Sequence, residues 1–533
     1  MSQSQACAAT VIAQLVAQGV RELVVCPGSR SAPLALAALA AQSDSVRLHV
    51  RADERTAGFL ALGLAKGGAG PVAVVTTSGT AVGNLLPAVM EASHSSLPVV
   101  VVSADRPASL VGFGANQTTD QHGLFGGFVR WQAQLDSQAD ARSWAAQTAR
   151  GVGMALGRLG GLPGPVHLNV ALALPLADGA QVALPATTAR HFEPVWPDRT
   201  PVRPTHFGSR AIVIAGDAPP GVHADWGNAP LPVIAEPTAG IKGPSMLRCG
   251  RLLLASALAQ EVNHVIVAGR PNLSREVSAM LSRDNIEVTV CGDERGWADS
   301  AWTATTFFRR VEFGPADPAW LKRWQAADAL VSTALDDLLV AEPRFTGWHV
   351  AQVVNAALTS SDVLVVGNSS PVRDLALTPV VPTVYANRGL AGIDGTLSTA
   401  LGIALATSQA RSVTAYLGDL AFLHDANALA IPPGEPKPPL RIVVADDHGG
   451  SIFATLEYGR PEYAPAFEHV FAADAATDLV ALAQAYGVAA RRVAAAEELR
   501  LALEPVPTDL EVIVVETDRT ARAELAAKIA ALT

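Results

Sequence analysis

The sequence predicts an α/β protein made of three Rossmann-like parallel-sheet domains. Short, continuously apolar runs alternate with helix-length segments, glycine- and serine-rich polar loops follow the runs, and the pattern occurs three times in 533 residues. Such alternation is typical of parallel sheets covered by helices on both faces. An apolar content of 49% with 17% charged residues indicates a globular chain with large buried cores.

The first predicted domain covers residues 1–178. We expect its strands at Glu22–Cys26, Arg47–Arg51, Val72–Thr76 and Val99–Ser103, each followed by a polar loop and then a helix. Residues 179–205 are rich in proline, threonine and alanine, which predicts a linker.

The second predicted domain, residues 206–340, has expected strands at Ala211–Ala215, Pro232–Ala235, His264–Ala268 and Glu287–Cys291. A mostly helical connection, Ala319–Leu339, leads to the third domain, residues 341–533. Strands are expected there at Val363–Val366, Thr383–Ala386, Val413–Leu417, Arg441–Ala445 and Glu511–Glu516, with a helix at Ala421–Ala430.

Composition excludes several classes of protein. A net charge of −10 argues against nucleic acid or an anionic membrane as the main partner. The N-terminus has no basic signal-peptide region, and no apolar run is long enough to span a bilayer, so we expect no membrane insertion. The cysteines lack metal-ligand spacing and predict buried thiols in a reducing cytoplasm: Cys7, Cys26, Cys249 and Cys291.

Two acidic turns organise the third domain. Gly418-Asp419 follows one apolar run, and Asp446-Asp447-His448-Gly449-Gly450 follows the next. In a parallel sheet both turns would lie at the carboxyl edge, where open α/β sheets bind ligands. Helix-start amides at Gly418, Leu420 and Ala421 suit an anion, and carboxylate oxygens beside it suit Mg²⁺ or Mn²⁺. This pattern predicts a metal-bridged diphosphate, although Asp419 alone could simply cap the following helix.

The pattern resembles the fingerprint of thiamine-diphosphate enzymes, in which Gly-Asp-Gly precedes paired asparagines. Here Gly-Asp-Leu replaces the first part, and Asp446-Asp447-His448 stands where asparagines are usual. The second metal ligand is therefore open among Asp446, Asp447 and His448. We take Asp447, with the Gly449 carbonyl as the third protein oxygen.

Polar loops of the first domain supply further candidates. Ser29 and Arg30 follow the first strand, where a guanidinium suits a carboxylate or a phosphate. Glu54 opens an apolar helix and would be partly desolvated, although a glutamate in a first helical turn is also favoured by the helix dipole. Gln117 could bond a substrate carbonyl. His122 is better explained as a solvated or packed histidine than as an acid or base.

Loops of the third domain complete the candidate set. Ser369 and Arg373 follow a strand, Arg388 and Ile393 lie in a glycine-dense loop, and Ile452 and Phe453 would add an apolar wall. Several arginines on such loops in an acidic protein predict a substrate with several carboxylates: Arg30, Arg106, Arg275, Arg373 and Arg388.

These loops together resemble one family, the 2-succinyl-5-enolpyruvyl-6-hydroxy-3-cyclohexene-1-carboxylate synthases, which are thiamine-diphosphate enzymes of menaquinone biosynthesis. The resemblance rests on strings that occur in order, dense in the first and third domains and sparse in the middle one: CPGSRSAPL, RADERTAGFLALGLAKG, TTSGTAVGNLLPAV, SADRPASL, GANQTTDQHGLF, GNSSPVRDL, ANRGLAGIDGTLSTALG and GDLAFLHDANAL.

The resemblance implies decarboxylation of 2-oxoglutarate and 1,4-addition of the resulting succinyl carbanion to isochorismate, with active sites between subunits of a homodimer or homotetramer. It implies that Glu54 activates the cofactor and that Ile393 and Ile452 support it. It implies a substrate site of Ser29, Arg30, Gln117, Ser369, Arg373, Arg388 and Phe453, and a metal site of Asp419, Asp447 and Gly449. Arg275 stands where the family carries a basic pair, and is a candidate carboxylate ligand.

Three other functions would leave parts of this sequence unexplained. A thiamine-diphosphate 2-oxo acid decarboxylase or carboligase of the acetolactate-synthase type would not need arginines on so many loops. A dinucleotide-binding oxidoreductase would carry GxGxxG after a strand, and no strand here is followed by it. A non-catalytic, cofactor-binding regulatory protein would not need Glu54.

Overall fold

The computed structural model describes residues 1–192, 203–205, 210–219, 221–292, 296–308, 311–407 and 409–533. The chain divides into two compact units. The first comprises Met1–Pro197, Asn387–Gln409 and His424–Pro438, and the second comprises Asp198–Ala386, Ala410–Leu423 and Pro439–Thr533. The domain boundaries at residues 178, 205 and 340 stay predictions, and residues 193–202 of the predicted linker lie outside the described residues.

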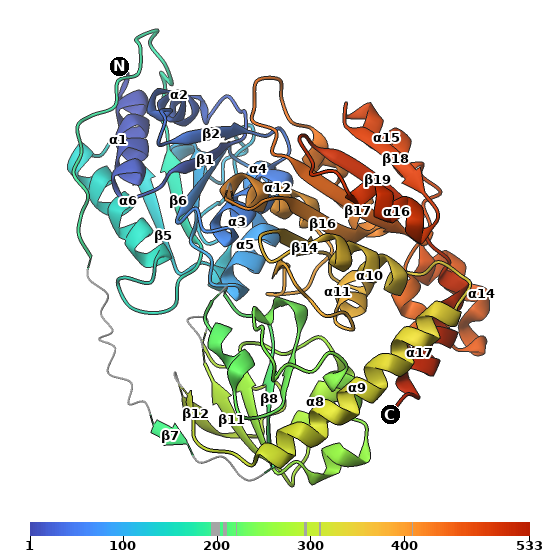
Figure 1. Cartoon of the computed structure of the whole chain (residues 1–533). Coiled ribbons are helices and arrows are strands. Elements are labelled where there is room, and N and C mark those ends of the chain that lie inside the picture. Colours follow the sequence, from blue (N-terminus) through green and yellow to red (C-terminus); the bar gives the residue numbers. More distant parts are fainter. Residues whose placement is uncertain (193–202, 206–209, 220, 293–295, 309–310, 408) are drawn as a thin grey trace. The chain divides into compact units, whose positions relative to one another are not determined.

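The first unit is built on a parallel sheet (Figure 1). Its strand order is β2 (Arg47–Val50), β1 (Glu22–Val25), β3 (Val72–Thr76), β4 (Val99–Asp105), β6 (Val166–Ala171) and β5 (Trp131–Asp136). Side chains of α1 (Gln3–Ala17), α2 (Ala32–Ala41) and α6 (Ala141–Ala155) join its main core. Helices α3 (Glu54–Lys66), α4 (Thr80–Gly83) and α5 (Leu86–His94) follow β2 and β3 along the chain.

The second unit contains two further parallel sheets and a short strand pair. The first sheet has the order β12 (Ala304–Phe308), β11 (Glu287–Cys291), β10 (His264–Ala268), β8 (Ala211–Ala215) and β9 (Val233–Ala235). Residues of α7 (Gly250–Leu253), α8 (Arg275–Leu281) and α9 (Pro318–Ala341) pack in its core. Strand β7 (Arg203–Thr205) pairs with β13 (Val311–Phe313).

The other sheet of this unit has the order β15 (Thr383–Tyr385), β14 (Val363–Val366), β16 (Val413–Gly418), β17 (Leu440–Asp446), β19 (Glu511–Glu516) and β18 (Ala489–Val493). Its core includes α10 (Gly347–Ala357), α11 (Ser370–Leu375) and α16 (Ala496–Leu503). Numbered in chain order within each sheet, this order is identical to that of the sheet in the first unit.

Helix α12 (Thr396–Ala406) belongs to the first unit and packs against α3. The contact is close because each helix presents a glycine. A Cβ on Gly63 would lie 2.2 Å from the Thr399 carbonyl oxygen, and a Cβ on Gly402 would lie 2.4 Å from that of Leu60. Glycine thus allows the two backbones to touch.

The structure confirms the predicted fold class, since the described residues form three parallel sheets of five or six strands besides the β7–β13 pair. One predicted element is wrong. The helix expected at Ala421–Ala430 is instead the short helix α13 (Asp419–His424), followed by a 3₁₀ turn at Ala426–Leu429. The break lies at Asp425, whose backbone is not helical and whose side chain binds Ser398. None of the described helices is both long and apolar enough to cross a membrane.

Candidate active site

Two predicted arginines lie close together at the carboxyl edge of the first sheet. The Arg30 Nη1 atom donates to the Leu172 carbonyl oxygen (2.8 Å), and the Arg106 Nη1 atom donates to Ser78 Oγ (2.6 Å). Burial, with the positive charge of Arg106, holds the pKa of the Arg30 guanidinium below its ordinary value. Two neighbouring cations favour an anionic ligand. Ser29 is exposed beside them.

Gln117 and Ser78 form a small hydrogen-bonded unit with Arg106. The side-chain Nε2 of Gln117 donates to the Ser78 main-chain carbonyl oxygen (3.0 Å). The main-chain carbonyl oxygen of Gln117 accepts from Ser78 Oγ (2.9 Å) and from Arg106 Nη1 (2.7 Å). The buried Ser78 therefore connects two predicted site residues, a role that its place in the TTSGT string does not reveal. Gln117 has a φ of 55°, an uncommon backbone conformation for a residue other than glycine.

Glu54 is the first residue of α3 and is half-buried. The preceding Asp53 caps this helix, because its Oδ1 atom accepts from the backbone N–H groups of Arg55 (2.9 Å) and Thr56 (3.2 Å). Its Oδ2 atom accepts from Asn427 Nδ2 (2.9 Å). Asp53 therefore caps α3, and Glu54 lies in the first turn, where the helix dipole also favours a carboxylate.

Arg388 and Ile393 also lie in the first unit, on residues 387–395, which connect β15 to α12; we call this segment the 387–395 loop. The side chain of Arg388 is 2% exposed, and that of Ile393 is half-buried. Thr396 Oγ1 donates to the Ile393 carbonyl oxygen (2.9 Å) at the start of α12.

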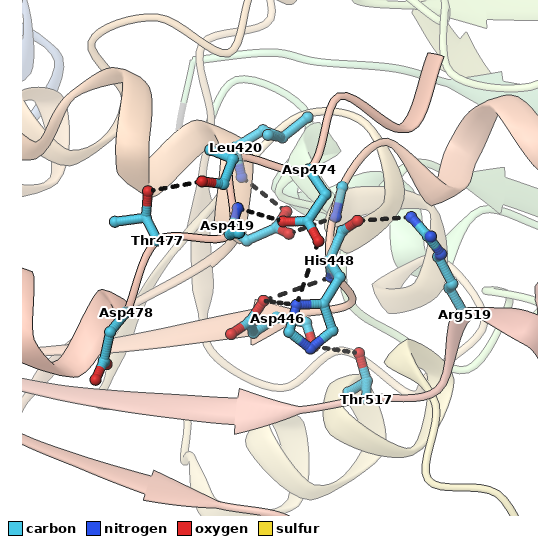
Figure 2. Close-up of polar contacts among 12 residues, drawn as sticks. Asp419, Leu420, Asp446, His448, Asp474, Thr477, Asp478, Thr517 and Arg519 are labelled. Atoms are coloured by element: carbon cyan, nitrogen blue, oxygen red, sulfur yellow. Dashed lines mark hydrogen bonds and ion pairs between the residues drawn. The ribbon is translucent and has the colours of Figure 1, made fainter. Parts of the chain in front are cut away.

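In the second unit, Asp419 lies where β16 ends and α13 begins. Its Oδ1 atom accepts from the Leu420 N–H and its Oδ2 atom from the Gly449 N–H, both at 2.7 Å (Figure 2). Burial, and then the charge of Asp447, raise the pKa of Asp419 to about 8. The Gly449 bond thus joins the two acidic turns identified in the sequence.

Among the candidates for a second metal ligand, Asp447 is the one whose charge acts most on Asp419. Burial raises its own pKa to about 6. Asp446 pairs instead with Arg492 (3.1 Å), and the half-exposed His448 ring lies 3.9 Å from Asp446 and from Asp474 (Figure 2). These contacts favour Asp447 over its neighbours.

The donor set fits a divalent cation. Burial raises the pKa of both half-buried carboxyl groups, and the charge of Asp447 raises that of Asp419 further, so a positive charge between them would be favourable; hard oxygen ligands suit Mg²⁺ or Mn²⁺. Within the described part of the chain, no three histidine, cysteine, aspartate or glutamate side chains cluster as metal ligands. A Cβ on Gly418 would meet nothing within 4 Å, so space is open beside this turn. The Leu420 amide is engaged by Asp419, and Ala421 is buried.

Ser369 and Arg373 form a pair at the start of α11. Arg373 Nη1 donates to the Ser369 carbonyl oxygen (2.8 Å), and Ser369 has a φ of 71°. Positive φ values occur at eight described residues other than glycine. Four of them, Gln117, Ser369, Ala391 and His448, lie on predicted site loops, and the other four, Ser96, Trp302, Ala473 and Ala476, do not. Such strain is found preferentially at functional sites.

The remaining candidates lie on separate segments of the second unit. Ile452 and Phe453 are half-buried in a 3₁₀ turn at Ser451–Thr455, and the Phe453 ring lies 5.9 Å from that of Phe471. Arg275 is exposed and forms an ion pair with Glu457 at 3.1 Å.

Comparison with known proteins identifies similar chains. Family models described as the N-terminal and C-terminal TPP binding domains of thiamine pyrophosphate enzymes match residues 6–124 and 367–517. Proteins named 2-succinyl-5-enolpyruvyl-6-hydroxy-3-cyclohexene-1-carboxylate synthase are similar over the full length. That of a Nocardioides species is 43% identical over 99% of this chain and 97% of its own. Those of Rhodococcus erythropolis and Mycobacterium bovis are 43% and 40% identical over 100% of both chains.

Proposed function

The chain belongs to the 2-succinyl-5-enolpyruvyl-6-hydroxy-3-cyclohexene-1-carboxylate synthase family, and from this membership we propose that it decarboxylates 2-oxoglutarate and adds the remaining four-carbon unit to isochorismate in 1,4 fashion. The chain is a thiamine-diphosphate-dependent enzyme, and its product serves menaquinone biosynthesis. The observation that supports this choice of substrates is the Arg30–Arg106 pair, because both substrates are polyanions.

Asp419, Asp447 and the Gly449 carbonyl would hold Mg²⁺ or Mn²⁺ against the diphosphate, with Gly418, Leu420 and Ala421 lining that end of the site. When bound, thiamine diphosphate supplies the nucleophilic carbon for attack on a 2-oxo group. Glu54 would hold a proton against the aminopyrimidine ring, since a half-buried carboxyl that is not needed for capping is available for this role. Ile393 and Ile452 would support the ring system.

The substrate side of the site would consist of arginine guanidinium groups and one apolar wall. Arg388, Arg373, Arg275 and the Arg30–Arg106 pair would bind carboxylates, and Ser29, Gln117 and Ser369 would orient oxygen atoms. Phe453 would exclude water from the reacting carbon. For Arg275 this requires exchange of its partner, because it pairs with Glu457 in the structure.

The protein would act in the cytoplasm as a homodimer or homotetramer. The four cysteines are buried thiols, which agrees with a reducing compartment. The family's arrangement would place Glu54 of one subunit and the metal ligands of another in one site.

The proposal is tested by incubating the protein with Mg²⁺, thiamine diphosphate, 2-oxoglutarate and isochorismate. We expect both substrates to be consumed together with release of CO₂. Glu54→Gln should reduce turnover at least about 100-fold with an unchanged circular dichroism spectrum, since the amide cannot exchange the proton. The exposed Glu498→Gln serves as the control and should remain active. Equal turnover of pyruvate would instead indicate an acetolactate-synthase type of enzyme, and an active Glu54→Gln variant would contradict the role of Glu54.

A further inference from the structure

The 387–395 loop has few side chains of its own with which to hold a conformation. Gly389, Gly392 and Gly395 account for three of its nine residues. Yet it carries Arg388 and Ile393. In the proposed function these two side chains must be placed accurately, one against the substrate and the other against the cofactor. Glycine adds backbone freedom, so a fixed loop of this kind needs contacts from outside.

The N-terminal part of the loop is held by Glu91 of α5. The Glu91 Oε1 atom accepts from the Gly389 N–H (2.9 Å), and its Oε2 atom accepts from the Leu390 N–H (2.7 Å). Ser95 Oγ donates to Oε1 as well (2.9 Å). The side chain is 4% exposed, and hydrogen bonds to an ionised carboxylate are the stronger kind.

The loop backbone passes so close to the Glu91 carboxylate that position 389 is best occupied by glycine. A Cβ on Gly389 would lie 2.9 Å from both carboxylate oxygens of Glu91 and 2.8 Å from Ser95 Oγ. Arg388 directly precedes Gly389, so its backbone is fixed by the same two bonds.

The C-terminal end of the loop is held by Asp425 through α12. The N-cap of this helix is Gly395, which offers no side-chain acceptor and has a φ of 61°. The Asp425 Oδ2 atom accepts from the Ser398 N–H (2.6 Å), and its Oδ1 atom accepts from Ser398 Oγ (3.0 Å). Asp425 is fully buried and so caps the helix from a distant part of the chain.

Gly395 further fixes this end against the helix that begins with Glu54. A Cβ there would lie 1.9 Å from the Phe59 ring, so the loop backbone lies directly on that α3 side chain. Ile393 is two residues away, and its carbonyl oxygen accepts from Thr396 Oγ1.

We propose that Glu91 and Asp425 are positioning residues that hold the two ends of the 387–395 loop, and thereby set Arg388 for the anionic substrate and Ile393 for the cofactor. The roles of Arg388 and Ile393 rest on the proposed function. In the described part of the chain, the carboxylates of Glu91 and Asp425 accept hydrogen bonds from backbone amides and serine hydroxyls.

Matched substitutions separate positioning from stability. Glu91→Gln keeps the shape but turns an amide N–H₂ toward one of the two loop N–H groups. Its control is Glu22→Gln, since Glu22 is 3% exposed and bonds Arg47 and His49 away from the loop. Asp425→Asn is compared with Asp362→Asn, since Asp362 is 1% exposed and bonds Arg411, Ser412 and Thr359.

We expect Glu91→Gln to raise the KM for 2-oxoglutarate about 10-fold or more, with little change in the Kd of thiamine diphosphate, because a small displacement of a binding group has a large effect. Asp425→Asn should raise the Kd of thiamine diphosphate, measured by protein fluorescence, by a similar factor. The two controls should lower the Tm and leave both constants unchanged. Constants that shift equally in variants and controls would overturn the proposal.

Amide hydrogen exchange provides a readout that is independent of activity. In protein without ligands, peptides covering residues 387–398 should exchange about 10-fold faster in Glu91→Gln and in Asp425→Asn than in the parent, and at the parent rate in the controls. Unchanged exchange would overturn the proposal. If the parent protein forms no product, the proposed function fails, and exchange alone decides whether these carboxylates hold the loop.

A milder variant covers the case in which Asp425→Asn does not fold. Ser398→Ala removes one of the two bonds to Asp425 and leaves the bond to the backbone N–H. We expect faster exchange in the same peptides by about two- to three-fold. Exchange at the parent rate would contradict the role of Asp425.

Discussion

A buried chain of hydrogen bonds connects strands β4 and β6 to the turn after β3. Ser103 Oγ has one proton and donates it to Asn169 Oδ1 (2.7 Å), so His167 Nε2, 2.7 Å from the same Oγ, must carry a proton and act as donor. Asn169 Oδ1 also accepts from Gln121 Nε2 (2.8 Å), and Gln121 Oε1 accepts from the Gly79 N–H (2.8 Å). The neutral His167 ring thus supports the turn that carries Ser78.

This histidine predicts a specific pH dependence of stability. Burial, with a smaller contribution from His122, lowers the pKa of His167 to about 3 from the ordinary 6.5. The unfolded chain binds a proton near pH 6.5 while the folded protein does not. The contribution of His167 to the free energy of unfolding is therefore fully present above pH 6.5 and is lost as the pH falls toward 3.

We expect His167→Gln to flatten the fall in the free energy of unfolding between pH 6.5 and 4, where one proton accounts for about 1.4 kcal/mol per pH unit. Denaturant titrations at pH 7, 5.5 and 4 measure the slope. The exposed His191→Gln is the control and should keep the parent slope. A parent-like slope in His167→Gln would show that another group titrates.

At the scale of single residues, the sequence predicted candidate site residues that directly follow an expected strand, such as Arg30, Glu54 and Asp419, because that position alone indicates the ligand-binding edge of the sheet. It did not predict Glu91, Ser78 or Gln121, because their importance lies in contacts with residues far along the chain. A glutamate on an apolar helix or an amide in a loop carries no local mark of such a contact.

At the scale of elements, the crossing of α3 and α12 depends on glycine. Gly63→Ala would place a Cβ 2.2 Å from a backbone oxygen that no side-chain rotation can move. We expect a loss of about 1–3 kcal/mol in the free energy of unfolding, measured by denaturant titration. Gly83→Ala is the control, because a Cβ there meets nothing within 4 Å, and alanine should be neutral or stabilising by up to about 1 kcal/mol. Equal effects of the two substitutions would contradict close helix contact.

Strand prediction succeeded where burial on both faces produces an uninterrupted apolar run, as in β3 and β17. It missed β5, β6, β7, β12, β13 and β18. In β5 (WQAQLD) and β18 (AARRV), each the outermost strand of its sheet, polar residues interrupt the apolar run, and in the fully buried β6 (VHLNVA) a histidine and an asparagine interrupt it. The break of the helix at Asp425 was also missed. The local spacing of apolar residues cannot show that the Asp425 side chain accepts a hydrogen bond from a different helix, α12.

At the scale of the whole molecule, one strand order occurs twice, in the sheet of the first unit and in the six-stranded sheet of the second. The sequence predicted three similar domains from their alternating pattern. It did not predict that Asn387–Gln409 and His424–Pro438 would join the first compact unit, since that depends on packing between distant segments.

The proposed assembly predicts complementation between inactive variants. In a dimer with Glu54 and Asp419 contributed by different subunits, Glu54→Gln mixed with Asp419→Asn gives hybrids with one intact and one doubly altered site. After unfolding and refolding equal amounts together, we expect activity to recover to about a quarter of the parent value, because about half the dimers are hybrids. No recovery, despite hybrid formation shown by differently tagged chains, would mean that both residues act within one chain.

Each compact unit contains buried cysteine thiols whose chemical modification would report transient opening of that unit. Cys7 and Cys26 lie in the first unit and Cys249 and Cys291 in the second, all shielded from solvent. Burial also raises the pKa of the Cys7 thiol to about 12, so it is doubly unreactive in the closed state. A disulfide reagent in solution therefore modifies each thiol only at the rate at which local opening exposes it to solvent. The order in which the cysteines are labelled then ranks the two units by how often they open.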